Sequence, residues 1–457
     1  MKKYITLIVF SLLVASTFTT LAQRVFYVND SISMPEVEIP EVFVKSIKEN
    51  REIGKLPTAV SLIGAAKIEQ TEVQNLKDIT AQVPNLFMPD YGSKLTSPIY
   101  IRGIGSRINS PSVGLYVDGV PYFEKSAFDF DFMDIDRIEV LRGPQGTLYG
   151  RNTMGGIINI STKSPIKYQG TQLNVSAGNY GFLKLGATHH HKVSNKLGFT
   201  VGAQMNHHNG YFTNLFTNEV ADELNSYSGR GKVLWMPSKN STLEYSVSGE
   251  VSKQGGYPYA IVDKTTLKAG DVNYDHYSGY NRNMVSNGLT LKFEHEKYTL
   301  MSTTSHQYYY GHQDIDQDFT PAALYAVVQD ETQNMFSEEI MLRSNGETRY
   351  NWLFGAYGFH QSFDKTLEMD YGLDFTAPKK LPADYSYDKS YDNQTLGGAL
   401  FHQSTLNDFL VEGLTLTAGI RADFETDKQD YLHEILSNGN TQVKADTLYP
   451  SRTSAKI

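Results

Sequence analysis

The chain has 457 residues, no cysteine and a formal net charge of −9. The absence of cysteine excludes disulfide scaffolds, Cys-ligated zinc, iron–sulfur clusters and thiol nucleophiles. The negative charge argues against a nucleic-acid partner, because a phosphate backbone requires a basic face. The 37 Gly, 30 Tyr and 23 Phe, against only 2 Trp, favour a long antiparallel β structure with aromatic belts.

The first 22 residues have the pattern of a secretory signal peptide. Lys2 and Lys3 precede an apolar run at 5–14, and small residues follow as far as Ala22. An apolar stretch of about ten residues is too short for a transmembrane helix. We therefore expect a cleaved signal at 1–22 rather than a membrane anchor.

Residues 23–50 are expected to form a flexible segment ahead of the first folded domain. Pro35 and Pro40 enclose alternating Val and Glu residues, a pattern that permits an extended strand but no helix. Such a segment can add as a strand to the edge of a partner's sheet, or it can remain a solvated tail.

Residues 51–165 predict a compact mixed α/β domain. Apolar residues with helical spacing predict a helix at 65–82. Asp118-Gly119 is a hairpin turn signal. Short strands are expected at 58–63, 98–103, 113–120 and 135–144, and a glycine-rich loop leads into a buried strand at 148–160.

From residue 166 to residue 457, apolar and polar residues alternate with period two. Every second residue is apolar at 197–205 and again at 414–424. Short turns, as at 194–196, contrast with long polar connections, as at 253–287. This asymmetry favours a transmembrane β-barrel with an apolar outer face over a soluble β-sandwich, which would share only the alternation.

Three further patterns were considered as sites of chemistry. Asp129, Asp131, Asp134 and Asp136 lack the glycine and the terminal glutamate of a calcium loop, so an edge strand or turn is expected there. The histidines at 189–191 are expected at the surface, because adjacent residues of a strand point to opposite faces. No Ser/His/Asp arrangement stands out. We expect no catalytic residue, metal or cofactor, and no enzyme activity.

Four segments resemble the plug of TonB-dependent outer-membrane receptors, in the order and at the spacings of that family. They lie at 101–103, 117–121, 137–146 and 148–160. The resemblance implies a mixed α/β plug followed by an antiparallel transmembrane β-barrel of about 22 strands in a Gram-negative outer membrane. Because residues 166–457 hold only about 14 strands at this spacing, we expect a C-terminally truncated barrel that cannot close.

The resemblance also assigns roles to particular residues. It places a TonB box, which would bind TonB by strand addition, at Glu41, Val42, Phe43, Val44 and Lys45. It places contacts between plug and barrel at Arg102, Glu139, Arg142 and Glu339. We expect Arg142 to pair with Glu339 or a neighbouring wall carboxylate, with Arg102 nearby, because a lone buried charge is costly.

Aromatic residues in the long connections are candidate ligand contacts, because a tyrosine offers both a stacking face and a hydroxyl group. For the run at 308–310, an aromatic girdle at the lipid headgroups is an equal alternative. The candidates are Tyr257, Tyr259, Tyr274, Tyr277, Tyr280, Tyr308, Tyr309 and His312.

The plug motifs are most similar to those of iron–siderophore receptors. The resemblance therefore implies binding of an iron–siderophore complex and its import to the periplasm, with TonB and outer-membrane lipid as partners. A vitamin or oligosaccharide receptor of the same family is the first alternative. A non-transporting surface-binding barrel and an inactive gene fragment also stay open.

Overall fold

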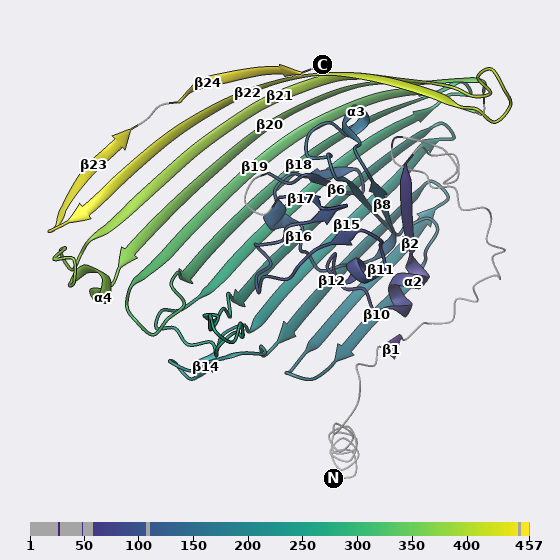
Figure 1. Cartoon of the computed structure of the whole chain (residues 1–457). Helices are drawn as coiled ribbons and strands as arrows, with labels where there is room; N and C mark the ends of the chain where they lie inside the picture. Colours follow the sequence, from purple (N-terminus) through teal and green to yellow (C-terminus); the bar gives the residue numbers. More distant parts are fainter. Residues whose placement is uncertain are drawn as a thin grey trace, which may run out of the picture.

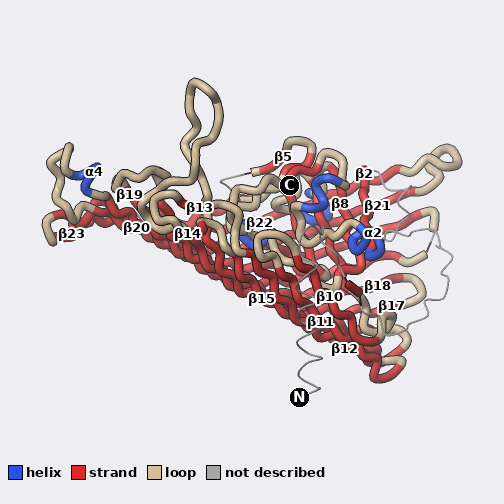
Figure 2. The backbone as a smooth tube through the Cα atoms, turned by 90° about the horizontal axis from the view of Figure 1, so that it is seen from below, coloured by secondary structure: helices blue, strands red, loops and turns tan. Residues whose placement is uncertain are grey.

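The computed structural model describes residues 26–27, 48, 58–106, 110–346, 348–446 and 449–456. Within these ranges a small mixed domain, called the plug below, lies against one face of a large curved sheet, called the wall (Figure 1). Figure 2 shows the same arrangement from below, with the plug elements on one side of the wall. No helix in these ranges has the length and apolar character of a membrane span.

The plug is built on a five-stranded sheet of order β2–β8–β9–β6–β7, in which β6 and β9 run parallel. A second, three-stranded sheet contains β3, β4 and β5. The plug elements are β2 (Ala59–Gly64), α2 (Ala65–Gln70), η2 (Asp78–Ala81), β3 (Leu86–Phe87), β4 (Tyr100–Ile101), β5 (Ile104–Gly105), β6 (Val113–Val117), β7 (Val120–Tyr122), η3 (Lys125–Ala127), β8 (Ile135–Arg142), α3 (Gly146–Tyr149) and β9 (Gly156–Thr162).

The plug encloses its own apolar core. Ile138 and Val140 of β8 and Ile158 and Ile160 of β9 are fully buried, because these two strands occupy central positions in the sheet. The predicted hairpin joins β6 to β7. Asp118 and Gly119 adopt φ values of 48° and 83°, the left-handed conformation that a tight two-residue hairpin turn requires.

The helix predicted at 65–82 is shorter in the structure. It ends at Gln70, and Glu72 adopts a φ of 51°, which no α-helix continues through. The Asp78 carboxylate accepts hydrogen bonds from the Gln74 and Asn75 amides at 2.7 and 3.2 Å. Such side-chain hydrogen bonds to the backbone compete with the hydrogen bonds of a helix. The helix therefore stops, although the apolar residues keep their helical spacing through the turn that follows.

The wall pairs its strands antiparallel, and the described part of the chain contributes 14 strands to it. Fold class is thereby confirmed as a mixed plug followed by a large antiparallel sheet. The wall strands are β1 (Phe26–Tyr27), β10 (Gly170–Ala177), β11 (Leu183–Ser194), β12 (Leu197–His208), β15 (Leu224–Ser238), β16 (Ser241–Gly255), β17 (Gly279–Glu294), β18 (Tyr298–Asp316), β19 (Tyr325–Ser344), β20 (Tyr350–Tyr371), β21 (Ser386–Leu406), β22 (Leu416–Ser437), β23 (Asn440–Asp446) and β24 (Tyr449–Lys456).

The two ends of the wall differ in their connections. Turns at one end, the turn end, are short, whereas the other end, the loop end, carries long connections between β12 and β15, between β16 and β17, and between β20 and β21. Three short elements lie in these connections, namely β13 (Thr213–Asn214), β14 (Glu219–Val220) and α4 (Leu373–Thr376). Among the described strands no pairing joins β10 to β22, so the wall curves without closing on itself.

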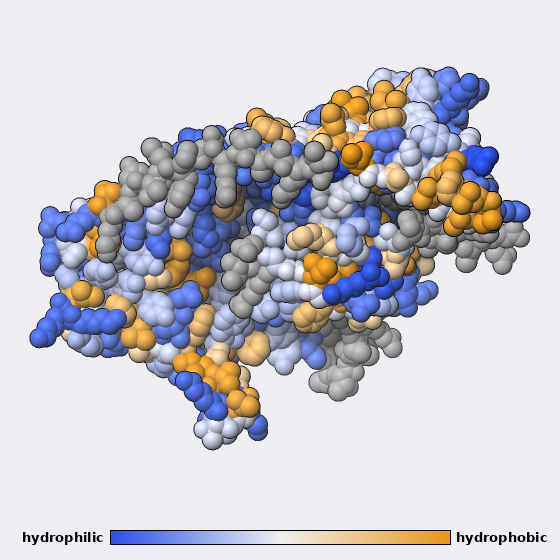
Figure 3. Space-filling model, turned by 45° about the horizontal axis from the view of Figure 1, so that its top comes forward, coloured by the Kyte–Doolittle hydropathy of each residue, from blue (hydrophilic) through white to orange (hydrophobic). Residues whose placement is uncertain are grey.

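The two faces of the wall differ as the period-two alternation predicts. Residues facing the plug are mainly polar and include buried Ser, Thr, Gln and charged side chains. The opposite face exposes large apolar side chains, among them Leu173, Val201, Val233, Val285, Leu300, Phe336, Ile340, Phe354, Leu400 and Phe424. In Figure 3 the visible surface is mostly polar, with apolar groups in separate patches.

Candidate functional site

The contact between plug and wall is the most extensively charged region of the structure. At its centre lies Arg282 of β17, whose side chain is 0% exposed. It forms an ion pair with Glu250 of β16 and donates hydrogen bonds to the carbonyl oxygens of Ser126 (2.8 Å) and Asp129 (2.6 Å) in the plug. This wall arginine therefore binds the plug backbone at two positions, Ser126 and Asp129.

The same cluster continues into the plug through Lys94. Its Nζ lies 3.0 Å from Asp131 and 3.7 Å from Glu250. Burial by itself would raise the pKa of Asp131, but the ammonium groups of Lys94 and Lys184 outweigh burial and lower this pKa to about 2. Lys94 of the plug and Arg282 of the wall thus neutralise Asp131 of the plug and Glu250 of the wall. Buried charges require such pairing.

Two further aspartates of the plug contact basic side chains on the first wall strands. The hairpin residue Asp118 binds Arg230 at 3.2 Å and Lys232 at 3.1 Å on β15. His190 of β11 lies 3.0 Å from Asp134. His190 is 4% exposed, so the expectation of surface histidines at 189–191 is wrong for the middle residue, which faces the plug.

The aspartates at 129–136 lie in and beside the segment between η3 and β8. Residues 129–134 belong to no strand, and 129–133 are buried. Each contacts a different basic side chain: Lys77, Lys94, His190 and Arg137 respectively. Of the expected edge strand or turn, no strand forms at 129–134, where the backbone is a loop with a bend at Asp134. Within the described ranges, no group of three or more His, Asp or Glu residues is placed to hold a metal ion.

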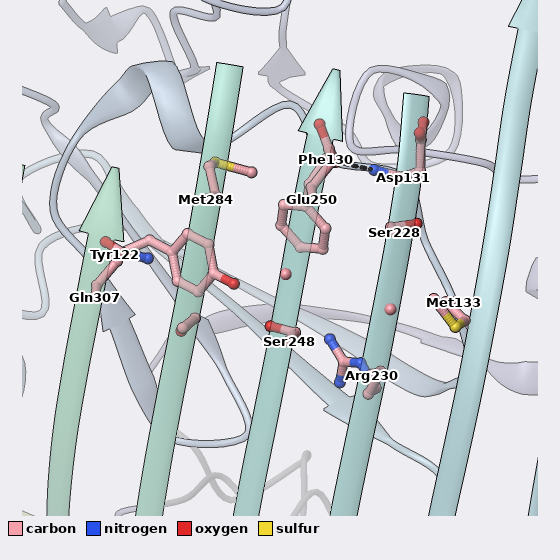
Figure 4. Close-up of a pocket in the computed structure, with 13 residues that line it drawn as sticks. Tyr122, Phe130, Asp131, Met133, Ser228, Arg230, Ser248, Glu250, Met284 and Gln307 are labelled. Atoms are coloured by element: carbon pink, nitrogen blue, oxygen red, sulfur yellow. Dashed lines mark hydrogen bonds between the residues drawn. The ribbon is translucent and has the colours of Figure 1, made fainter. Parts of the chain in front are cut away.

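A small cavity lies in this charged contact (Figure 4). Tyr122 and Phe130 of the plug line it together with Arg230, Ser248 and Met284 of the wall. Its volume is about 30 Å³, which is room for a water molecule or two but not for a small-molecule ligand.

Three predicted tyrosines lie where the loop end meets the plug. Tyr280 accepts a hydrogen bond from the Lys94 amide at 2.8 Å, and Tyr259 donates one to the Tyr91 carbonyl at 2.7 Å. Tyr257 accepts a hydrogen bond from the Ser93 hydroxyl at 3.4 Å and donates one to Gln313 of β18 at 2.5 Å. The hydroxyls of these tyrosines thus hold the plug loop at 91–94, and Tyr257 and Tyr280 are 5% and 2% exposed.

The other predicted aromatic residues separate according to their position. Tyr274 is buried against Val272 and Phe319 between two long connections. Tyr277 is 55% exposed and lines a depression of about 240 Å³ together with His312.

Strand alternation separates the run at 308–310. Tyr309 is 1% exposed and faces the plug. Tyr310 and His312 both contact Asp330, at 2.8 and 2.9 Å, on the opposite face. Tyr308 lies two residues from Tyr310, hence on the same face of the strand, and is half-buried. The predicted aromatic residues consequently form no single ligand surface.

An aromatic row that the sequence did not single out lies on the plug-facing side of β21 and β22, near the loop end. Tyr391 and Tyr431 are cross-strand partners with ring centroids 4.9 Å apart. His433 lies 5.4 Å from the ring of Tyr387, and Lys389 Nζ lies 4.8 Å from that same ring. The signal in the sequence was the spacing Tyr387, Lys389, Tyr391, which places three side chains on one face of a strand.

The predicted contact residues of the plug need correction. Glu139 lies inside the plug, 1% exposed, where it accepts a hydrogen bond from Arg137 at 2.8 Å. Burial raises the pKa of Glu139, and the Arg137 guanidinium opposes that shift. It touches the next plug strand rather than the wall, since β8 pairs on both sides with β2 and β9.

The predicted ion pair between Arg142 and Glu339 is not formed. Arg142 donates a hydrogen bond to the Pro84 carbonyl at 3.2 Å, within the plug. Arg102, at a φ of 52° in the turn between β4 and β5, has its guanidinium beside Gly143. Among described residues neither arginine has an ion-pair partner, whereas Glu339 binds Lys48. The predicted TonB box at 41–45 lies outside the described residues.

The glycine-rich motif at 148–160 is explained by a close approach of the wall. Gly150 has a φ of 74°, and a Cβ atom added there would lie 2.5 Å from Nη2 of Arg421 on β22. Any larger residue would push the wall arginine away from the plug. The glycine therefore serves packing between the two domains as well as the turn after α3.

Comparison with known proteins supports this architecture. Residues 52–157 match the family model described as TonB-dependent Receptor Plug Domain. The chain is 34% identical over 126 residues to the pesticin receptor of Yersinia pestis, covering 27% of this chain and 19% of the receptor. It is 29% identical over 143 residues to the vitamin B12 transporter BtuB of Vibrio vulnificus, covering 30% and 23%.

Solved structures extend the likeness to the wall. The ferric yersiniabactin uptake receptor FyuA from Yersinia pestis superposes with a TM-score of 0.73 at 19% identity, over 87% of this chain and 60% of that one. The ferric-catecholate import receptor Fiu from E. coli gives 0.57 at 12% identity, over 85% and 71%. The chain thus spans less than two thirds of FyuA and about a fifth of its curated relatives. Residues 52–157 therefore belong to the family of TonB-dependent receptor plug domains, and the plug and wall together share the fold of these solved receptors.

Proposed function

We propose that this protein is an outer-membrane receptor that binds an iron–siderophore complex and imports it to the periplasm with energy from TonB. The observation that carries the proposal is the contact between plug and wall. It is held by buried ion pairs among Lys94, Asp131, Glu250 and Arg282, which satisfy one another and can separate as units. On this charged side, displacing the plug would expose polar rather than apolar surface.

The aromatic row at Tyr387, Tyr391, Tyr431 and His433 supports a ligand with flat rings. Aromatic residues on the plug-facing side cannot form a girdle against lipid, because a girdle lies on the outer face. Neighbouring aromatic rings beside the ammonium group of Lys389 suit an anionic, aromatic iron chelate. Two neighbours of the same fold are named as receptors of a ferric yersiniabactin and of ferric catecholates.

A vitamin receptor is the second candidate, favoured by the sequence similarity of the plug to BtuB. Growth of a strain lacking the gene, on a panel of ferric chelates with cobalamin and oligosaccharides as parallel tests, separates the two. Loss of growth on one ferric chelate supports iron uptake. Normal growth on every chelate with loss on cobalamin would replace the first candidate with the second.

Coupling to TonB is tested at the predicted box. In the receptor expressed in its host, Val42→Pro should abolish uptake, because it removes a main-chain donor that strand addition needs. Binding of the ligand at the cell surface should stay intact. Val42→Ala, which keeps the donor, is the matched control and should retain most of the uptake. Wild-type transport by Val42→Pro would reduce this stretch to a linker.

A further inference from the structure

A carboxylate lies among the apolar side chains on the face of the wall that is turned away from the plug. Glu338 of β19 lies between Phe336 and Ile340, which are 54% and 48% exposed on that face. Its two oxygen atoms accept hydrogen bonds from the hydroxyl groups of Ser302, at 2.6 Å, and Thr304 on β18. Within the part of the chain that the structure describes, Glu338 has no cationic partner.

Glu338 is far from the turn end of the wall. Tyr350 and Trp352 of β20 lie near that end on the same face, where an aromatic girdle is expected. Gly358 is the cross-strand partner of Glu338, and a strand tilted by about 40° rises about 15 Å between residues 352 and 358. Since the apolar band of an outer-membrane barrel is about 25 Å tall, Glu338 falls inside it. An ionisable side chain at such a depth indicates a contact with a partner.

A depression of about 680 Å³ begins at Glu338 and extends over β20, β21 and β22. Gly358 and Gly398, which are cross-strand partners, line it. Outside the flanking residues, the nearest atom to a Cβ added at Gly358 would be 3.9 Å away, and at Gly398 3.5 Å. The fold therefore does not require glycine at either position. Because glycine weakens a strand, its presence here indicates that another backbone approaches closely from outside.

The same face carries a hydrogen-bond donor beside the carboxylate. His306 of β18 stacks on Phe336 with ring centroids 4.3 Å apart. Its Nδ1 accepts a hydrogen bond from the Asn287 side-chain amide at 3.3 Å, which leaves the proton on Nε2. Among the described residues this Nε2–H group has no acceptor. Glu338 pairs with Thr304, the neighbouring position of β18 on this face, so the unused donor and the carboxylate lie one strand apart.

We propose that the receptor associates with a second copy of itself through this face, with His306 of each copy donating to Glu338 of the other. The inference rests on the proposed function, which places this face in the membrane. Two copies in one membrane share their orientation, so a two-fold axis between them runs along the membrane normal and forms each contact twice. A patch that holds both the carboxylate and its donor meets this requirement. A lipid acyl chain would fill the depression but has no donor for Glu338.

The absence of cysteine in the sequence makes a direct test possible in outer membranes from the host. Thr304→Cys and, separately, Ile340→Cys each place one thiol beside Glu338, and oxidation with copper phenanthroline should join two copies by a disulfide. Val201→Cys, on the same face at β12 and 55% exposed, is the control for random collision. Its dimer yield should be lower by about fivefold or more, because it lies outside the two-fold contact.

Two further changes test the depression and the carboxylate. In the Ile340→Cys receptor, Gly398→Leu and Glu338→Leu should each lower the dimer yield by about fivefold or more, because the first prevents the close approach and the second removes the acceptor. Gly229→Leu, at a glycine of β15 where the nearest atom to an added Cβ would be 3.8 Å away, is the matched control and should leave the yield unchanged.

Heat-modifiable migration checks that each variant is folded, and the two Leu variants provide independent routes should one of them fail that check. The interface is overturned by an absence of dimer from both Thr304→Cys and Ile340→Cys, by yields equal to that of Val201→Cys, or by an unchanged yield in a folded Leu variant. Cross-linking needs neither ligand nor uptake, so these outcomes leave the transport proposal standing. Absence of the receptor from the outer-membrane fraction would overturn the transport proposal and the interface together.

Discussion

The plug contacts the wall in two different ways. Against the strands from β11 to β17 the contact is charged, with Asp118, Asp131 and Asp134 facing basic side chains of the wall or of the neighbouring plug loop. Against β19 to β21 it is mainly apolar, as Leu148 and Tyr149 pack with Met341, Leu353 and Phe401. Lys48 and its ion pair are inserted into this apolar side.

The difference matters because the two kinds of contact respond to different conditions. Apolar burial stabilises by about 25 cal/mol per Å² and needs no particular partner. A buried ion pair adds little net stability, yet removing one member costs about 3–5 kcal/mol. The charged side should therefore define where the plug sits, and the apolar side should supply most of the adhesion.

The largest effect is expected from breaking the charged side at its centre. Arg282→Met removes the partner of Glu250 and two donors to plug carbonyls, so the free energy of unfolding should fall by about 4 kcal/mol. Urea denaturation of the purified protein measures it. Arg349→Met, at an exposed turn residue, is the control, and equal stability of the two variants would remove Arg282 from the centre of the contact.

A smaller effect is expected from the apolar side. Leu148→Ala opens a cavity against Phe401 and its neighbours and should cost about 3 kcal/mol. Leu148→Met keeps the volume and should cost less than about 1.5 kcal/mol. The loss for Leu148→Ala should be independent of salt and pH. A strong dependence on pH would mean that the two sides are not distinct.

Acid should weaken only the charged side. The pKa of Asp131 is about 2 in the folded protein, against its ordinary value of 3.8 in an unfolded chain. A carboxyl group whose pKa is lowered by folding stabilises the folded protein at any pH above its unfolded-state pKa. For Asp131 this contribution is about 2 kcal/mol. That contribution is lost as the pH falls from about 4 through 2.

Asp131→Asn should flatten this part of the profile of unfolding free energy against pH. Asp271→Asn, at an exposed loop position, serves as its control and should leave the slope as it is. A slope between pH 4 and pH 2 that survives in Asp131→Asn would assign the acid sensitivity to another carboxylate.

The smallest effect is expected where a tyrosine of the loop end touches the plug. Tyr280→Phe removes the acceptor of the Lys94 amide and should cost about 1 kcal/mol. Hydrogen exchange of the Lys94 amide should rise about fivefold, following the same free energy. Tyr277→Phe, at an exposed neighbour, should change neither quantity. Unchanged protection in Tyr280→Phe would show that this amide is held by other contacts.

Turns and strand faces in this site could be predicted from local sequence, because they depend on neighbouring residues of the chain and not on the residues they contact in space. Asp118-Gly119 specifies its turn through the left-handed backbone of two adjacent residues. Period-two alternation specifies which side chains of β12 share a face, whatever strand lies beside it.

The partners of the charged residues could not be predicted in this way. Asp131 meets Ser226 across 95 residues of sequence, and Lys48 meets Glu339 across 291. The sequence analysis singled out neither Arg230 nor Arg282. Each is an isolated charge within a strand that alternates with period two, and a buried charge of this kind requires a partner.

The sequence by itself thus determined the plug motifs, the strands and the faces of the wall. Only the tertiary structure decided that Glu339 binds Lys48 rather than Arg142, because curvature of the wall and the seating of the plug set which charges come within reach.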